Sequence, residues 1–386
     1  MTIRSTVRIH STGQWCVRVS RAMAACVAVG CLAATSGEAA APAAPQVVAI
    51  VESAAGSRLM PLDARTLEPR RGGWSRAIAK GAAAALSPSG ARVAITASGD
   101  WVLVLDAASG RVVRRIGEAG FEEQIYWLGG DGTAGRRPAL LLGVTFGCWS
   151  LGCGNEYTIV GSGGSSGYSG EPEAVAALRE GLAFAYVPTK VYVYGLDYGL
   201  GNDIDIELPR MPASAPFQLV PDVAHSRLFV VSSAGMVAEI DRFGDLRRRP
   251  RVRYHRVALN GRPFAATWAG AGKLALWGKD GLGTIDTRTW STQGIAPGVT
   301  GAVATPFGLA AWTSDPADGL TVYRPDGRRR LRVLAGKRIH TAVAVGGYLY
   351  ADVADDRYSV DLRTGKVTGP LPRDARILVP DLVAIP

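Results

Sequence analysis

The sequence has few charged residues and, after its first 40 residues, no long apolar run. Charged side chains make up only 20% of the 386 residues, whereas hydrophobic residues make up 47%. This much apolar surface can offset the entropy of ordering a chain, so the composition excludes disorder. A membrane-spanning helix needs about 18 or more consecutive apolar residues, so we expect no membrane span. The composition indicates a globular protein that buries one large core or two moderate ones.

Histidine is also scarce, and motifs of catalysis are missing. Only His225, His255 and His340 follow the N-terminal segment, and we find no carboxylate or nucleophile at a telling spacing from any of them. No Gly-x-Ser-x-Gly elbow occurs. Surface or turn positions are therefore the favoured interpretation of all three histidines, although a triad assembled across the fold stays open. We name no catalytic residue and no metal ligand, and we expect no cofactor.

Five cysteines are present, and only Cys148 and Cys153 lie beyond residue 31. Four residues separate them, and flanking glycines let the chain turn back until the two Cα atoms are within about 6 Å. We therefore predict a disulfide between them that pins a surface loop, with free thiols as the alternative. Zinc binding would need further Cys or His ligands, and none lies nearby in the sequence.

Residues 1–40 have the pattern of a signal peptide. Four arginines precede a short apolar stretch at 22–34, and small residues follow it. Cleavage after Ala39 or the next residue would leave a short Ala/Pro linker up to residue 45. We therefore expect a secreted protein or one on the exterior of the cell envelope. The alternatives are a lipid anchor on Cys31 and an uncleaved leader.

Residues 46–386 contain an internal repeat of about 43 residues. The clearest unit, at 86–113, reads as four short strands closed by Gly, Pro, Asp and Ser. Its third strand ends in Asp106, with Gly110 four residues later. The corresponding third-strand ends along the chain are Asp63, Asp106, Asp197, Asp241, Asp286, Tyr323 and Asp361. One step between these marks has double length, so we count eight units.

Units of four short strands cannot bury their faces alone, and a radial stack of such units is a β-propeller. We therefore predict an all-β chain with a single propeller domain at 46–386 and about eight four-stranded blades. Seven blades are the alternative, if the irregular region at 120–170 is a loop. The first unit lacks its first strand, whereas surplus segments at 377–379 and 382–385 follow the last unit. We predict that the C-terminal segment supplies the missing inner strand of the first blade.

The repeat resembles the exported YVTN-type and WD-repeat-like β-propellers, through the segments at 87–94 and 105–112. The resemblance covers roughly residues 46–386. It implies an architecture but hardly an activity, because such propellers include binding scaffolds, sensors, lyases and quinone-dependent dehydrogenases. The Trp-Asp and Gly-His pairs of true WD repeats are absent, so we do not assign that subclass.

The segment at 129–170 departs from the repeat, with glycine-rich stretches on both sides of the cysteine pair. Loops on a rigid frame often carry binding residues. We therefore take Trp127, Trp149 and Tyr168 as candidate ligand contacts. The alternative role of these aromatic residues is packing between blades.

Arginines cluster near the predicted outermost strands. One cluster at 328–338 accompanies a denser one that contains Arg247, Arg248, Arg249, Arg251, Arg253 and Arg256. A polyanion-binding patch is one hypothesis for them. Protection of the unpaired strand edges is the favoured alternative, because charge there opposes aggregation. Export and the lack of interleaved aromatic residues argue against nucleic acid as a partner.

These patterns favour a monomeric binding or scaffolding module for a protein or cell-envelope ligand. The alternative is an enzyme of the exported propeller type, either a lyase or a quinone-dependent dehydrogenase. Residues 361–366 match the Asp-x-x-Thr-Gly-Lys blade motif of the quinone enzymes. The match ends there, because Gly369 stands where that family has a docking Trp and no adjacent cysteine pair exists. The chain is also far shorter than those enzymes, so we predict that it binds no quinone.

Overall fold

Antiparallel strands form the regular secondary structure of the chain in the computed structural model. The structure describes residues 46–87, 89–97, 101–117, 124–128, 139–149, 152–160, 166–169, 174–177, 181–195, 204–222, 225–241, 250–257, 263–278, 281–378 and 384–385. Within these ranges there is no α-helix. No helix that could span a membrane is found in this part of the chain.

Blades 1 to 4 each begin with an innermost strand near the middle of the ring and end with an outermost strand. Blade 1 consists of β32 (Ala375–Ile377), β1 (Gln46–Ser53), β2 (Gly56–Asp63) and β3 (Arg76–Ile78). Blade 2 consists of β4 (Ala84–Leu86), β5 (Arg92–Ala97), β6 (Trp101–Asp106) and β7 (Val112–Gly117). Blade 3 consists of β8 (Gln124–Leu128), β9 (Ala139–Trp149), β10 (Gly152–Val160) and β11 (Ser166–Ser169). Blade 4 has five strands, β33 (Ala384–Ile385), β12 (Ala174–Ala177), β13 (Gly181–Val187), β14 (Lys190–Gly195) and β15 (Ile204–Glu207).

The other four blades follow the same order. Blade 5 consists of β16 (Phe217–Asp222), β17 (Arg227–Ser232), β18 (Met236–Asp241) and β19 (Arg251–Arg256). Blade 6 consists of β20 (Pro263–Gly270), β21 (Lys273–Gly278), β22 (Gly281–Asp286) and β23 (Thr292–Ala296). Blade 7 consists of β24 (Val299–Thr305), β25 (Gly308–Thr313), β26 (Leu320–Tyr323) and β27 (Arg329–Val333). Blade 8 consists of β28 (Ile339–Val345), β29 (Tyr348–Val353), β30 (Asp356–Asp361) and β31 (Val367–Leu371).

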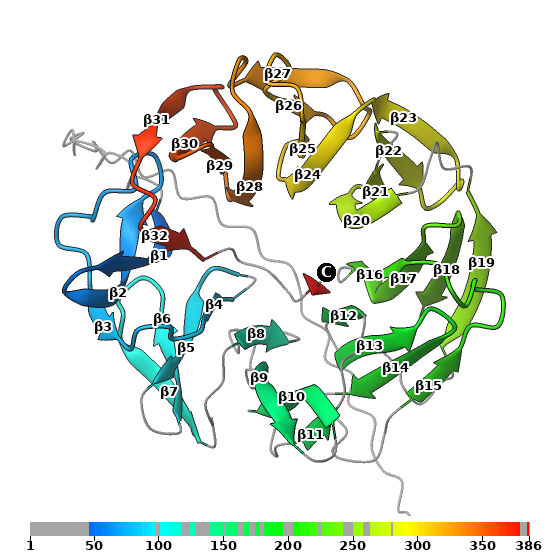
Figure 1. Cartoon of the computed structure of the whole chain (residues 1–386), viewed down its shortest axis with the longest axis horizontal. Helices are drawn as coiled ribbons and strands as arrows, with labels where there is room; N and C mark the ends of the chain where they lie inside the picture. The colour runs from blue at the N-terminus through cyan, green and yellow to red at the C-terminus, as the bar shows by residue number, and fades with distance from the viewer. Residues whose placement is uncertain are drawn as a thin grey trace, which may run out of the picture. The chain divides into compact units, whose positions relative to one another are not determined.

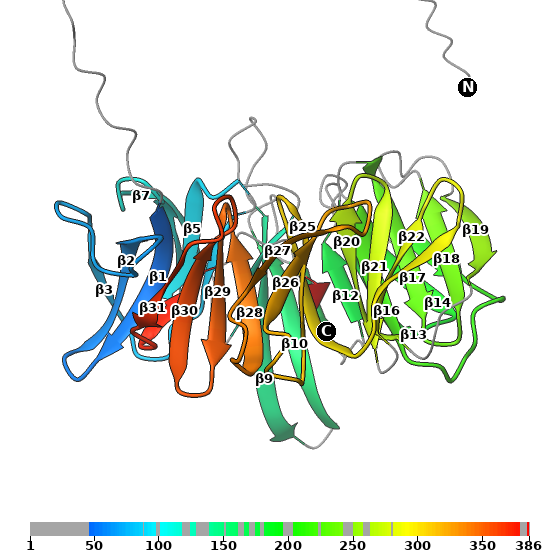
Figure 2. The same ribbon diagram turned by 90° about the horizontal axis from the view of Figure 1, so that it is seen from above.

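The sheets are arranged radially, with their first strands near the middle of the ring and their last strands at the rim (Figure 1). Figure 2 shows the same sheets from the side, standing next to one another. The predicted all-β propeller is therefore confirmed, and the eight sheets of the described residues match the count of eight units. The irregular region forms a four-stranded sheet of its own, β8 to β11, inserted between blades 2 and 4 in chain order.

Both faces of a blade are buried, so alternate residues of one strand contact different neighbours. In β1, Val48 and Ile50 pack with blade 2, whereas Val47 and Ala49 pack in a cluster that includes Tyr350 of blade 8. Seven of the eight neighbouring blade pairs share such a cluster among the described side chains. The hydrophobic core is therefore a series of layers between blades.

The recurring Asp at the end of a third strand forms the turn to the outer strand, as predicted. Asp106 Oδ1 accepts hydrogen bonds from the backbone N–H and the hydroxyl of Ser109, at 2.9 and 2.8 Å. The N–H of Gly110 then donates to the backbone oxygen of Asp106. The bond from the Ser109 hydroxyl contributes most to a lowered pKa of Asp106. Asp286 and Asp361 close equivalent turns.

The last residue of this turn contacts the preceding blade in one of two ways. Gly110 has a φ of 68°, and a Cβ atom there would lie 2.5 Å from the Trp74 ring of blade 1. Gly365 lies against Leu331 of blade 7 in the same manner. In blade 6 the large side chain is on the turn itself. Trp290 occupies the left-handed position with a φ of 58°, and its ring stacks on blade 5.

The C-terminal segment closes the ring as predicted. β32 supplies the inner strand of blade 1 by pairing with β1, with Ala49 opposite Ile377 and Val51 opposite Ala375. Leu378 extends the contact, because its N–H donates to the oxygen of Val48 at 2.9 Å. The pairing of β33 with blade 4 was not anticipated by the repeat, which provides four strands per unit.

We expect the Gly110→Ala substitution to lower the free energy of unfolding by about 2 kcal/mol or more. A left-handed backbone costs a residue with a Cβ about 1–2 kcal/mol, and the overlap with Trp74 adds an overpacking cost. Chemical denaturation would measure the change. Gly90→Ala is the matched control, because Gly90 has a φ of 73° but open space around its Cβ position. Equal losses in the two variants would contradict a packing role for the Gly110 turn.

Candidate functional site

The three aromatic residues predicted as ligand contacts are not equivalent. Trp127 lies on β8, is fully buried and packs in the cluster between blades 2 and 3. Its Nε1–H donates to the backbone oxygen of Ala85 at 3.0 Å. Its described contacts therefore give Trp127 the alternative role, packing between blades, and leave no side-chain surface for a ligand. Trp149 and Tyr168 lie on β9 and β11, and their side chains are outside the described part, so their role stays a prediction.

The two cysteines lie on paired strands rather than in the loop that we expected. Cys148 belongs to β9 and Cys153 to β10. The hairpin pairs Trp149 with Gly152, and its register shifts between Gly152 and Gly154. The cysteine side chains are outside the described part, so the disulfide stays a prediction.

The arginine clusters do lie on outer strands where the structure describes them. Arg251 and Arg253 belong to β19, the outer strand of blade 5, whereas residues 247–249 are outside the described part. On blade 7, Arg330 lies over the ring of Phe307, and Arg332 donates to the backbone oxygens of residues 317 and 318. These contacts within a blade support the edge-protection alternative, and polyanion binding stays a prediction.

A network of charged side chains lies on the face of blade 5 that packs against blade 6. We call it the blade-5 network. Register across the sheet brings its members together, because Asp222 pairs with Arg227 and Glu239 pairs with Arg253. Apolar residues of the same face, such as Phe229, pack with blade 6. The network consists of Asp222, His225, Arg227, Glu239, Asp241, Arg253 and His255.

Arg227 is the centre of the blade-5 network. Its Nη2 lies 2.6 Å from Asp222 Oδ2, and its Nη1 lies 3.3 Å from Glu239 Oε1. The guanidinium also stacks over the rings of Phe229 and Trp268, at 5.3 and 5.7 Å from their centroids. Glu239 continues the chain of charges to Arg253 at 3.4 Å. Each carboxylate that is removed from water therefore has a cationic partner, as burial of charge requires.

His225 extends the network to the surface. Its Nδ1 lies 2.9 Å from Asp222 Oδ2, and the imidazole is 64% exposed whereas the Asp222 side chain is fully buried. Asp222 is the last residue of β16, the innermost strand of blade 5, and His225 lies in the connection from β16 to β17. An imidazole that is held through Nδ1 can still bind another molecule through Nε2. Our sequence interpretation missed this pair, although Asp222 stands only three residues before His225.

His255 is the second histidine of the network, and it is largely enclosed. Its Nε2 lies 3.3 Å from Glu239 Oε2. Its ring stacks on Trp290 of blade 6, with centroids 3.4 Å apart and planes inclined by 7°. Burial lowers the pKa of His255, although the hydrogen bond with Glu239 acts in the opposite direction. His255 stands sixteen positions after Glu239, so only the strand register reveals their contact.

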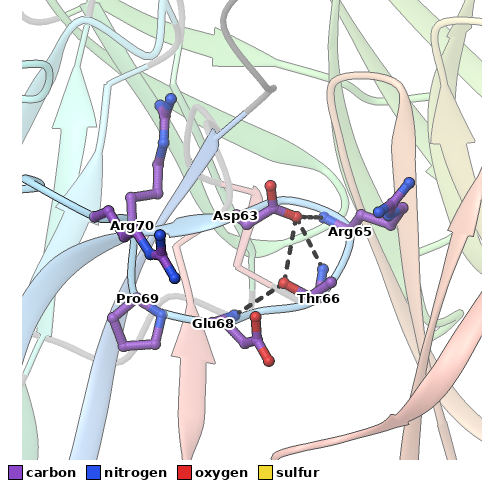
Figure 3. A pocket seen from close by; sticks show the side chains of 7 residues that line it. Asp63, Arg65, Thr66, Glu68, Pro69 and Arg70 are labelled. Carbon is purple, nitrogen blue, oxygen red and sulfur yellow. Dashed lines mark hydrogen bonds between the residues drawn. The ribbon is translucent and has the colours of Figure 1, made fainter.

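A shallow depression of about 420 Å³ lies at the turn from β2 to β3 (Figure 3). Asp63 lines it, but the Asp63 carboxylate accepts hydrogen bonds from the backbone N–H groups of Arg65 and Thr66 at 2.8 and 3.0 Å. Blade 8 holds the same turn, because the Ser359 hydroxyl donates to the oxygen of Arg65. These polar groups are thus used in building the turn, and the blade-5 network is the better candidate site.

The blade-5 network combines an exposed imidazole with a fixed chain of charges. Such a set can hold a polar ligand or move a proton at His225 Nε2. No cluster of three or more His, Cys, Asp or Glu side chains suited to a metal ion occurs among the described residues. The His340 side chain, on β28 of blade 8, is exposed and belongs to no such network.

We expect protonation of His255 to destabilise the folded protein. Because burial lowers its pKa in the folded state, the unfolded chain binds the proton more readily, and stability falls as the pH drops through about 6.5. Urea denaturation at a series of pH values between 8 and 5 would measure this loss. In the His255→Gln variant, which keeps a polar partner for Glu239 without titrating, the loss should be smaller. The exposed control His340→Gln should follow the wild type, and an unchanged slope in His255→Gln would contradict the assignment.

No family model and no curated protein sequence matches the chain. Among solved structures, apo AztD from Citrobacter koseri is 12% identical, with a TM-score of 0.53 over 86% of this chain and 96% of that chain. Dipeptidyl peptidase 4 from Porphyromonas gingivalis is 11% identical, with a TM-score of 0.50 over 75% of this chain and 52% of that chain. BamB from Moraxella catarrhalis is 15% identical, with a TM-score of 0.47 over 83% of this chain and 92% of that chain. At such identities the likeness concerns the fold alone, and the fold of the chain is that of a β-propeller.

Proposed function

We propose that the protein is an exported binding module that captures a protein or cell-envelope ligand on the ring face that carries His225. The observation that carries this proposal is an exposed imidazole held by a fully buried carboxylate. Burial of a charged group costs several kcal/mol of desolvation, and apolar residues in its place would often be at least as stabilising. What Asp222 provides is a fixed orientation of the exposed His225 side chain, and a fixed contact residue favours recognition of a ligand.

The position and rigidity of His225 support this function. The histidine lies in the connection from β16, the innermost strand of blade 5, to β17. Asp222, which holds it, is bound by Arg227, and the Arg227 guanidinium lies over the stacked rings of Phe229 and Trp268. A contact residue that is fixed before binding loses little conformational entropy when a ligand arrives.

An enzyme that transfers protons is the second candidate, and the same pair favours it. A carboxylate that holds Nδ1 of an imidazole prepares Nε2 to accept or donate a proton, as lyase chemistry requires. The quinone-dependent alternative has less support. In the segment that matches the quinone motif, Asp361 accepts hydrogen bonds from Arg363 and Thr364, and Gly365 packs on Leu331. The same turn recurs at Asp106 and serves the fold.

We expect His225→Ala to weaken ligand binding at least tenfold without unfolding the protein. The immobilised protein would be screened against a peptide array and purified cell-envelope glycans, and hits would be titrated by calorimetry. His340→Ala is the matched control, since it removes another exposed histidine on a different blade and should bind like the wild type. Equal affinities of the two variants for every hit would refute the site. Conversion of a hit into product, abolished in His225→Ala, would favour the enzyme.

Export is the second part of the proposal, and its support is the pattern of residues 1–40. We expect the protein recovered from outside the cytoplasm of a bacterial host to begin after Ala39 or Ala40. Intact-mass spectrometry would measure this cleavage directly. A mass that fits a lipidated Cys31 would indicate an anchored protein instead, and the mass of the full chain would show that the leader is retained.

A further inference from the structure

The fifth strand of blade 4 is the exception among the described sheets. β33 pairs antiparallel with β12, so that Ala384 lies opposite Ala176 and Ile385 lies opposite Val175. Because β12 is the innermost strand of its blade, this edge faces the middle of the ring, where the C-terminus is drawn in Figure 1. The other described sheets have four strands and end at their inner strand.

The inner edge of β12 lacks the features that discourage pairing on blades 5 to 8, as do the inner edges of β4 and β8. Inner strands β20, β24 and β28 each have a register shift against their own partner, and β16 contains Pro221. Shifts and prolines make a strand edge a poor template. In contrast, Ala174–Ala177 pairs residue for residue with β13 and contains neither proline nor charge. A regular, uncharged edge of small residues is one on which an extended segment can pair.

The segment that occupies this edge is short and tethered. β33 has only two residues. Its tether is β32 on blade 1, whose last residue is Ile377. The seven residue steps from Ile377 to Ala384 can span at most about 25 Å. Since each backbone hydrogen bond adds only a modest net stabilisation, a longer strand that makes more of these bonds would displace β33.

We propose that the inner edge of β12 is a strand-addition site for an extended, apolar segment of a protein partner. The chain's own Ala384 and Ile385 occupy this site when the partner is absent. Main-chain hydrogen bonds supply the affinity, and an uncharged segment like Leu-Val-Ala-Ile, residues 382–385, fits an edge made of alanine and valine. The site is distinct from the blade-5 network, so His225 has no part in it.

The first test removes the occupant and keeps the ring closed. A chain that ends at Leu378 loses β33 but retains β32 and the bond from Leu378 to Val48. We expect it to bind a fluorescent peptide of residues 379–386 with one-to-one stoichiometry. The full chain should bind that peptide at least tenfold more weakly, because a tethered tail competes at an effective concentration in the millimolar range.

The control peptide has Pro at the positions of both Ala384 and Ile385. Proline has no backbone N–H, so this peptide cannot donate the hydrogen bonds of an added strand, and we expect no binding. The proposal is overturned if the shortened chain keeps its circular dichroism spectrum and melting temperature but does not bind the first peptide. It is also overturned if both peptides bind equally.

A second test examines the register in the full chain. With Cys148 and Cys153 changed to Ser, the pair Ala176→Cys and Ala384→Cys should form a disulfide on oxidation, because these positions lie opposite each other. The control pair Ala177→Cys and Ala384→Cys is out of register by one residue, and alternate residues point to opposite faces. Mass spectrometry of the linked peptides would measure both yields. Equal yields, or no link in the first pair, would overturn the pairing of tail and edge.

Discussion

Burial of both faces of every sheet is the constraint on which the rest of the structure depends. A four-stranded unit of about 40 residues is too small to enclose a core, so its apolar faces are stable only against two neighbours. Residues Val47 and Val48, adjacent on β1, therefore belong to different clusters on opposite sides of blade 1. The same constraint makes closure essential, because an open row of blades would leave two apolar faces in water.

The blade-5 network stands out against this apolar packing. Asp222 and Glu239 are buried charged residues of the blade, and their carboxylates are matched by Arg227. The two aromatic rings beneath the guanidinium keep its position fixed. A rigid polar cluster within an apolar layer is costly for folding, so the benefit has to be sought in what the cluster presents at the surface.

Features set by local spacing could be predicted from the sequence. The hydrogen bonds that form the turn from Asp106 to Gly110 all lie within five residues. The recurrence of this pattern along the sequence therefore indicated the blades directly. The closing strand was predicted because a missing first strand and a surplus end are both visible along the chain. The outer-strand location of Arg251 and Arg253 followed from the same repeat register.

Features set by contacts between strands or blades could not be predicted. The stacking of His255 on Trp290 joins two blades, and nothing in the spacing of those residues reports it. Trp127 is buried by blade 2, although its neighbours in sequence suggested an exposed loop. Asp222 and His225 were within reach of local reasoning, but a carboxylate three positions before a histidine is common, and only burial distinguishes this pair.

The turns between third and outer strands have a consequence for how the chain assembles. Each described junction uses a different pair of shapes, such as an indole against Gly110, a leucine against Gly365, or Trp290 against an imidazole. The rim of a blade therefore matches the shape of one particular neighbour. The repeats are alike in architecture but not interchangeable in position, so the shapes at the junctions, as well as the order of the sequence, determine the cyclic order of the blades.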